Sequence, residues 1–308
     1  MRKAFVKKLT ELVSNNKNLY LLTGDLGFSV FDEFKEQFPD NFINMGVSEA
    51  NMIGVAAGMA MRGKQVFVYS IIPFVTFRVL EQIRNDLCLQ NLPVKIIGVG
   101  EGITYGTSGP THHAIEDIGV MSSLPNLTVI SPGDPIEVEK LVEQSLYLDA
   151  PCYIRLGKTG EEIINSQDVS LKIGKGNVIK EGKDIAIIST GNMLSSAIKV
   201  SMEFEKENVS SMVISLHTIK PLDETLLKEV SEKVKYIFVI EEHISSCGLG
   251  GKISFYYSQQ NINVRMKCIG LPDDFIKFVG KQDFLRMKYG LDVDGIKKSI
   301  ISFINSKK

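Results

Sequence analysis

The sequence predicts an α/β protein made of two consecutive open, mostly parallel sheet domains. Short runs rich in β-branched residues alternate with helical patterns in both halves of the chain, as is typical of parallel strands joined by crossover helices. A polar stretch containing Gly and Lys separates the halves and shows no sustained period. The 308 residues, 44% of them hydrophobic, are enough for two buried cores.

Each element follows from its local pattern. Strands of the first half are expected at 19–23, 42–45, 65–70, 94–99, 127–130 and 152–156. A helix is expected at 75–91, because Val79, Ile83 and Leu87 fall on one stripe opposite a polar face. In the second half, strands are expected at 185–190, 209–215, 236–241 and 264–268, and helices at 193–207, 221–234, 249–259 and 290–304. We place the domains at 1–160 and 183–308, with a linker and entry strand over 161–182.

Charge and composition exclude several classes of function. The 35 Lys and Arg residues balance 36 Asp and Glu residues, so no basic field is available for nucleic acid or an anionic membrane. The N-terminal residues resemble an amphipathic helix rather than a signal peptide, and no stretch approaches the roughly 20 apolar residues of a membrane span. The four cysteines are too far apart for a CxxC zinc site, and they indicate no disulfide framework. We expect a cytoplasmic protein.

Glu49 is the first residue that suggests chemistry. It is the only carboxylate in segment 48–60, which otherwise contains mostly small and apolar residues. A helix that is apolar on all sides has to be buried on all sides, which predicts contact with a second chain and places Glu49 in an interface. A carboxyl group there can hydrogen-bond to a ring nitrogen or share its proton. The alternative is an ordinary first-turn Glu beside an N-cap Ser48.

Two segments that follow predicted strands add candidate ligand contacts. Phe74 follows strand 65–70, at the edge where open α/β sheets bind ligands, and can stack on a planar ring; alternatively Phe74 and Phe77 belong to the core. The Gly-rich run 98–113 follows strand 94–99 and places His112 where a proton shuttle or hydroxyl contact is possible. It is not a phosphate loop, because the GxxxxGK[ST] pattern is missing. A lone His is more often structural, and His217 and His243 are interpreted in that way.

The order of these motifs resembles the transketolase family, specifically its pyrimidine-binding domain followed by its C-terminal domain. The resemblance covers nearly the whole chain. The matching segments are 24–29, 38–40, 46–51, Phe74 with Arg78, 109–112, 132–134, 153–156, 216–223 and 241–243.

The resemblance implies roles for individual residues. Glu49 matches the glutamate that contacts N1′ of the aminopyrimidine ring of thiamine diphosphate, which lets the 4′-nitrogen remove the C2 proton of the thiazolium. Phe74 matches an aromatic residue that packs on that ring. The other implied residues are Asp25, Ile71 and Phe77 around the cofactor, His112 and Ser108 at the hydroxyl groups of the donor sugar, and Arg2, Ser29 and Lys158 at its phosphate.

Four positions depart from the family pattern. Ile71 stands where a ring-contacting aromatic residue is usual, and Ser108 stands where many members have an Asp that distinguishes hydroxyl stereochemistry. Gly100 replaces a frequent phosphate-binding His. Lys158 replaces a common Arg and cannot form the bidentate contact of a guanidinium group.

The sequence lacks the family's diphosphate-binding motif, a Gly-Asp-Gly followed some thirty residues later by an Asn metal ligand. The resemblance therefore implies the C-terminal subunit of a split transketolase. A separate N-terminal subunit would hold the diphosphate and Mg²⁺ (or Ca²⁺), in an α2β2 assembly with the Glu49 helix near the dimer axis. The implied reaction transfers a two-carbon ketol unit from a ketose phosphate to an aldose.

Alternative functions remain open at this point. A 1-deoxyxylulose-5-phosphate synthase-like subunit and a 2-oxo-acid dehydrogenase beta chain would use the same Glu and the same domain order. A non-catalytic regulatory paralogue would explain the departures at Ile71, Gly100 and Ser108. The Gly-Pro-Thr-His loop end and the phosphate-type positions favour the sugar-transferring branch, but neither the sugars nor the pathway follows from the sequence.

Overall fold

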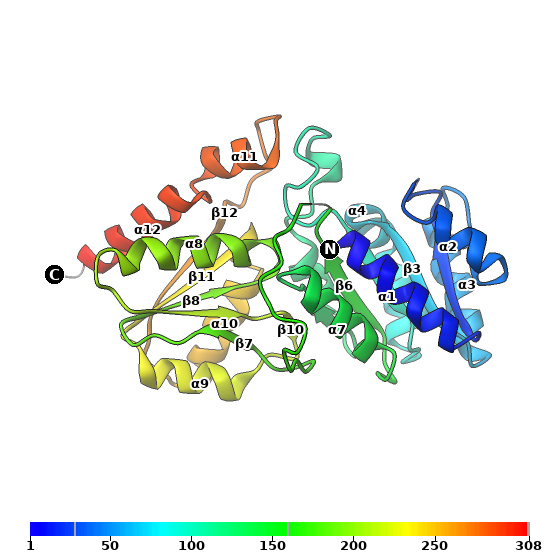
Figure 1. Ribbon diagram of the computed structural model, residues 1–308, viewed down its shortest axis with the longest axis horizontal. Helices are drawn as coiled ribbons and strands as arrows, with labels where there is room; N and C mark the ends of the chain where they lie inside the picture. Colours follow the sequence, from blue (N-terminus) through cyan, green and yellow to red (C-terminus); the bar gives the residue numbers. More distant parts are fainter. Residues whose placement is uncertain (28, 159, 307–308) are drawn as a thin grey trace.

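The chain folds into two α/β units that lie side by side, each around its own sheet (Figure 1). The computed structural model describes residues 1–27, 29–158 and 160–306. Within these residues the first sheet has seven strands and the second has five. Most neighbouring strands are parallel, so the predicted class of two consecutive open, mostly parallel α/β sheets is confirmed.

The first sheet follows the buried β-branched runs of the sequence. Its strands lie in the order β10-β5-β6-β4-β3-β1-β2. The bounds of the first six strands in the chain are β1 Leu19–Thr23, β2 Phe42–Asn44, β3 Gln65–Ile71, β4 Lys95–Val99, β5 Thr128–Ile130 and β6 Cys152–Leu156. The predicted strands differ from these by at most one residue at one end. Because β1, β3, β4 and β6 are parallel, the segments that follow them meet at one edge of the sheet.

Helices cover both faces of this sheet. Their bounds are α1 Arg2–Asn15, α2 Asp32–Gln37, α3 Glu49–Met61, α6 Asp117–Ser123 and α7 Pro135–Ser145, with short 3-10 turns η1 Pro39–Asn41 and η4 Pro110–His112. Helices α1 and α7 pack together over one core, and α3 packs over another. Asp134 caps α7 by accepting a hydrogen bond from the backbone N–H of Glu137 at 2.8 Å. In the described part of the chain, no helix has the length and apolar character that crossing a bilayer requires.

The predicted continuous helix over 75–91 is wrong. The segment is divided into α4 Ile72–Val75, the 3-10 turn η2 Phe77–Val79, α5 Leu80–Gln82 and the π-helical η3 Ile83–Cys88. Thr76 interrupts the helix, with φ −121° and ψ −74°, and its hydroxyl donates to the carbonyl of Ile72 at 2.6 Å. The predicted apolar stripe is nevertheless buried. The spacing of the hydrophobic residues therefore located the buried face but did not reveal the break in the helix.

The second sheet has the strand order β12-β11-β8-β9-β7. The strand bounds are β7 Asn177–Lys180, β8 Ile185–Ser189, β9 Ser211–Ser215, β11 Tyr236–Ile244 and β12 Arg265–Leu271. The helix bounds are η5 Gly191–Met193, α8 Leu194–Glu205, α9 Glu224–Lys233, α10 Leu249–Gln259, α11 Gln282–Tyr289 and α12 Val293–Asn305. Strand β7 corresponds to the predicted entry strand and pairs antiparallel with β9. Asp223 and Asp292 cap α9 and α12 through their side chains.

One strand from the second half of the chain joins the first sheet. Strand β10, Thr218–Lys220, pairs antiparallel with β5, and the N–H of Ser131 donates to the carbonyl of His217 at 2.8 Å. The sequence pattern did not predict this strand, because three residues carry no periodic signal. The domain limits 1–160 and 183–308, with a linker at 161–182, remain a prediction.

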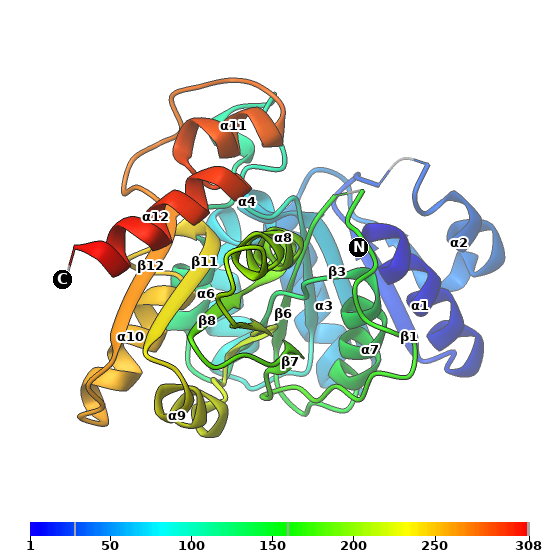
Figure 2. The same ribbon diagram turned by 60° about the vertical axis from the view of Figure 1, so that its left-hand side comes forward.

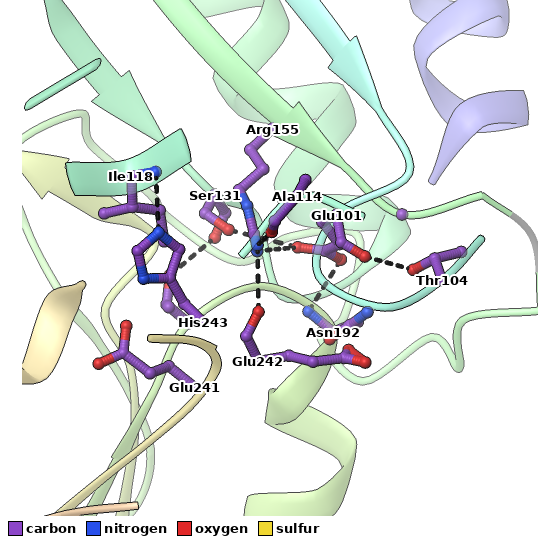
Figure 3. A network of polar contacts seen from close by, with 12 residues as sticks. Glu101, Thr104, Ala114, Ile118, Ser131, Arg155, Asn192, Glu241, Glu242 and His243 are labelled. Carbon is purple, nitrogen blue, oxygen red and sulfur yellow. Dashed lines mark hydrogen bonds and ion pairs between the residues drawn. The ribbon is translucent and has the colours of Figure 1, made fainter. Parts of the chain in front are cut away.

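A buried polar network centred on Arg155 joins the two units (Figure 3). Its guanidinium donates from Nε to Asp117 at 2.9 Å and from Nη1 to Glu101 at 3.0 Å. Its Nη2 donates to the carbonyl of Ala114 at 2.8 Å and to that of Glu242, in β11, at 3.3 Å. These groups are almost fully buried. A hydrogen-bonded network of this kind fixes the relative position of the two sheets, because every partner has lost its contact with water.

Glu137 forms a second polar link between the units and yields a testable pH dependence. It is fully buried and accepts hydrogen bonds from the N–H of Gly133 at 2.6 Å and from the hydroxyl of Ser215, in β9, at 3.0 Å. Burial raises the pKa of Glu137 to about 7, although these donors oppose the rise. The folded protein therefore keeps a proton that the unfolded chain loses near pH 4.5.

We expect Glu137→Gln to flatten the pH dependence of unfolding. In the wild type, the contribution of Glu137 is fully present below its unfolded pKa and is lost as the pH rises through about 7. The loss amounts to on the order of 3 kcal/mol, since one pKa unit corresponds to about 1.4 kcal/mol. Urea titrations between pH 5 and pH 8 measure it. An identical slope in the variant and the wild type would show that Glu137 does not titrate in this range.

Candidate active site

Glu49 is buried at the first turn of α3, with 2% of its surface exposed. Its Oε1 accepts a hydrogen bond from the Ser70 hydroxyl at 3.1 Å, and its Oε2 pairs with Nη1 of Arg78 at 2.8 Å. A Cβ atom added at Gly24, just after β1, would lie 3.2 Å from Oε1. The glycine therefore leaves space beside the carboxylate. Glu49 is held in place by neighbouring elements and is not an ordinary exposed first-turn residue.

Phe74, Arg78 and His112 form a continuous array next to Glu49. The Arg78 guanidinium lies over the Phe74 ring, with Cζ 4.4 Å from the ring centroid, while it also pairs with Glu49. The His112 ring meets the Phe74 ring edge to face at 5.3 Å between centroids. The structure thus brings together Glu49, Phe74 and His112, which the sequence places in three separate segments. All three segments follow strands or begin helices at the same edge of the sheet.

Tyr105 extends the array toward two cations. Its ring lies 6.1 Å from that of His112, and Nζ of Lys158 lies 4.6 Å from the Tyr105 centroid. Burial raises the pKa of Tyr105, whereas the nearby Arg2 charge lowers it. A Cβ atom at Gly100, where φ is +92°, would collide with the Tyr105 ring. The space above Gly100 is thus filled by Tyr105, which lies in contact with Lys158 and near the charge of Arg2.

Each of the remaining predicted site residues has its own surroundings in the structure. Arg2 and Ser29 line one cavity of about 490 Å³ between α1 and the segment before α2. Asp25 accepts a hydrogen bond from Nδ2 of Asn44 at 2.8 Å. Ile71 ends β3 and is half-buried, Phe77 is 37% exposed, and Ser108 is exposed on the loop that carries His112. Their roles toward a ligand stay predictions.

Three residues of the array, Ser70, Arg78 and Tyr105, were not predicted as site residues. Ser70 is the penultimate residue of β3, so its place at the ligand-binding edge could have been inferred from the strand end. Arg78 lies four residues after Phe74, a spacing that brings side chains together on a helix. Tyr105 had no signal beyond its place in the Gly-rich run, because its packing on Gly100 depends on the folded loop.

The outer face of α3 is exposed in the single chain. Its inner face packs Met52, Ile53 and Ala56 into the core, while Gly54 and Gly58 face outward. An apolar side chain near each end of the helix is also exposed: Val47, just before it, at 75%, and Met61, its last residue, at 61%. The expectation that this helix is buried on all sides is therefore not met within one chain. Small outward-facing residues would permit close approach of another helix.

The chain matches two family models that together cover most of its length. The model described as the pyrimidine-binding domain of transketolase matches residues 1–160. The model of the transketolase C-terminal domain matches residues 174–296. The first matched segment contains Glu49 and the residues arrayed around it, here called the Glu49 array (Glu49, Ser70, Phe74, Arg78, Tyr105 and His112). The second contains the strands of the second sheet.

Three individual proteins are similar over nearly their whole length. A putative transketolase C-terminal section of Methanocaldococcus jannaschii is 35% identical over 98% of this chain and 95% of that protein. One of the subunits of an apulose-4-phosphate transketolase of Phocaeicola vulgatus is 32% identical, over 98% and 97%. A solved structure described as a split gene transketolase, inactive beta4 tetramer, superposes with a TM-score of 0.92 at 32% identity, covering 100% of this chain and 99% of that one. The chain therefore belongs to the transketolase family, as the C-terminal transketolase-like subunit of a transferase that depends on thiamine diphosphate.

Proposed function

We propose that this chain transfers a two-carbon ketol unit from a ketose phosphate to an aldose, together with a separate N-terminal subunit. The observation that carries the proposal is the buried Glu49 carboxylate, which pairs with Arg78, whose guanidinium lies over the Phe74 ring that His112 meets at its edge. The sequence contains no diphosphate-binding motif, so the proposed partner supplies the site for the diphosphate and Mg²⁺. We further propose an α2β2 assembly in the cytoplasm, with the exposed face of α3 near the dimer axis.

The residues of the array fit an aminopyrimidine ring. Such a ring needs a carboxylate acceptor at N1′ and an apolar face, which Glu49 and Phe74 offer on the two sides of the Arg78 guanidinium that contacts both. The space left by Gly24 would be closed by any larger residue. Thiamine diphosphate supplies the carbanion chemistry at its thiazolium C2 when bound. Both carboxylate oxygens already have partners, so a ring nitrogen at Oε2 has to share that oxygen with Arg78 or replace it.

The other residues are proposed to bind and orient the sugar. His112, beside the Phe74 ring, would contact donor hydroxyls and move a proton there, with Ser108 on the same loop. Lys158 and Arg2, both near Tyr105, would bind the phosphate as two positive charges, with Ser29 in the Arg2 cavity. Asp25, Ile71 and Phe77 would border the cofactor. The relative from P. vulgatus is named for a phosphorylated ketose, which supports the choice of a ketose phosphate.

Reconstitution tests the proposed function. We expect the purified chain alone to be inactive and to gain ketol transferase activity when an N-terminal transketolase subunit, thiamine diphosphate and Mg²⁺ are added. The related structure described as an inactive beta4 tetramer supports this expectation. A panel of ketose phosphate donors and aldose acceptors measures the reaction. Activity of the isolated chain would contradict the split site, and decarboxylation of pyruvate in place of ketol transfer would contradict the reaction.

A further inference from the structure

The loop that carries His112 is closed at its base. Gly102 and Ala114 exchange two backbone hydrogen bonds, of 3.0 Å and 2.8 Å, so residues 102–114 form one closed segment, here called the His112 loop. In this loop Ser108 is exposed and His112 is half-buried. His113 points away from solvent and is only 3% exposed. The loop is thus a packed unit whose position determines where His112 lies.

The second unit holds the start of this loop through Glu242. This residue lies in β11, is 1% exposed, and its carboxylate is surrounded by donors. The carboxylate accepts from the N–H of Ile103 at 3.4 Å, from Nε2 of Gln282 at 2.8 Å and from Nη2 of Arg286 at 2.8 Å. Gln282 also donates to the Thr104 hydroxyl at 3.2 Å. Two residues of the loop are therefore tied to β11 and α11.

Packing on the outer side of the loop adds to these polar contacts. The N–H of Gly280 points to the carbonyl of Gly106 at 3.5 Å, and a Cβ atom on Gly106 would lie 2.7 Å from Cδ1 of Leu285. A Cβ atom on Gly102 would lie 2.7 Å from Cγ of Glu242, so the side chain of Glu242 also packs against the base of the loop. Figure 2 shows α11 beside this loop, as does Figure 1.

We propose that Glu242, Gln282 and Arg286 are positioning residues that hold the His112 loop in place for the donor sugar. The inference rests on the proposed function, because His112 and Ser108 are its sugar-binding residues. It gives the second sheet a part in the reaction although none of its described residues joins the Glu49 array. These three residues, here called the clamp, contact the base and the outer side of the loop and do not contact Glu49 or Phe74. The clamp is therefore expected to affect binding of the sugar and not binding of the cofactor.

Neighbouring glutamates provide a matched test. Glu242→Gln replaces one carboxylate oxygen by an NH2 group, which cannot accept a hydrogen bond. At least one of the three donors, Ile103, Gln282 or Arg286, then faces another donor and loses its hydrogen bond. Glu241→Gln makes the same change one residue earlier in β11, at a carboxylate that instead accepts from the N–H groups of Leu249 and Gly250 in α10. Both side chains are buried. The two variants therefore differ in what the carboxylate holds.

The first measurement is amide hydrogen exchange of the full chain. We expect Glu242→Gln to speed exchange over 103–113 by about tenfold or more relative to the wild type. Glu241→Gln is expected to speed exchange at the start of α10 and not in the loop. Equal loop exchange in the two variants would overturn the clamp. Gln282→Leu, which leaves the Arg286 ion pair intact, is expected to loosen the same amides by about threefold; no change there would also overturn it.

The second measurement uses the complex reconstituted with the N-terminal subunit. Glu242→Gln is expected to lower kcat/KM for the ketose phosphate by about tenfold or more, with the KM for thiamine diphosphate within about twofold of wild type. A rise in the KM for thiamine diphosphate as large as the fall in kcat/KM would indicate a general structural defect and contradict the proposal. If the wild-type complex transfers no ketol unit, the proposed function fails, while the exchange comparison still decides whether the clamp exists.

Discussion

Glu49→Gln is expected to reduce exchange of the thiamine diphosphate C2 proton by about a hundredfold or more in the reconstituted complex. The amide has nearly the shape of the carboxylate, so the hydrogen bond from Ser70 can persist. It carries no charge and cannot exchange a proton with a ring nitrogen, and it loses the ion pair with Arg78. Proton–deuterium exchange at C2, followed by NMR after acid quenching, measures this step without requiring a sugar.

Glu137→Gln is the control for this experiment. It makes the same carboxyl-to-amide change at another fully buried glutamate, which contacts Ser215 and lies outside the Glu49 array. We expect C2 exchange in this variant to stay within about threefold of wild type, because general acid-base catalysis requires a group in contact with the reacting ring. Near-normal exchange in Glu49→Gln, in a complex that still binds the cofactor, would remove Glu49 from its assigned role.

The sequence predicted the parts of the site that depend on order along the chain. Parallel strands ending at one edge bring the segments after them together, so the neighbourhood of Glu49, Phe74 and His112 follows from strand recognition and motif order. The same argument predicted the two sheets, because buried β-branched runs carry a strong local signal.

Contacts made by folded loops were not predictable in this way. Tyr105 fills the space above Gly100 only because the His112 loop closes on itself. The helix breaks at Thr76, whose hydroxyl bonds to the carbonyl of Ile72 in the preceding turn. Strand β10 joins the first sheet through three residues. Each of these features depends on tertiary contacts, which residue periodicity does not encode.

Arg155→Met is expected to lower the free energy of unfolding by about 3–5 kcal/mol, a large part of the 5–15 kcal/mol typical of a folded domain. Methionine fills a similar volume, but it leaves Asp117 and Glu101 buried without their shared cation. It also removes the donor to the Ala114 carbonyl, so the junction between the sheets loses its central contact. Urea unfolding at a fixed pH measures the change.

The loss should grow with pH, which separates the missing charge from missing volume. Burial raises the pKa of Glu101 to about 8 although Arg155 opposes the rise, so this carboxyl group is mostly neutral at pH 6 with or without Arg155. At pH 9 it ionises in the wild type, whereas without Arg155 its ionisation is opposed by burial alone, so the variant loses more stability there. Arg84→Met, at an exposed guanidinium that bonds to the side chain of its neighbour Asn85, serves as control and should change stability by less than about 0.5 kcal/mol. A loss in Arg155→Met that stays constant between pH 6 and pH 9 would mean that packing, and not the pairing of buried charges, holds the two sheets together at this point.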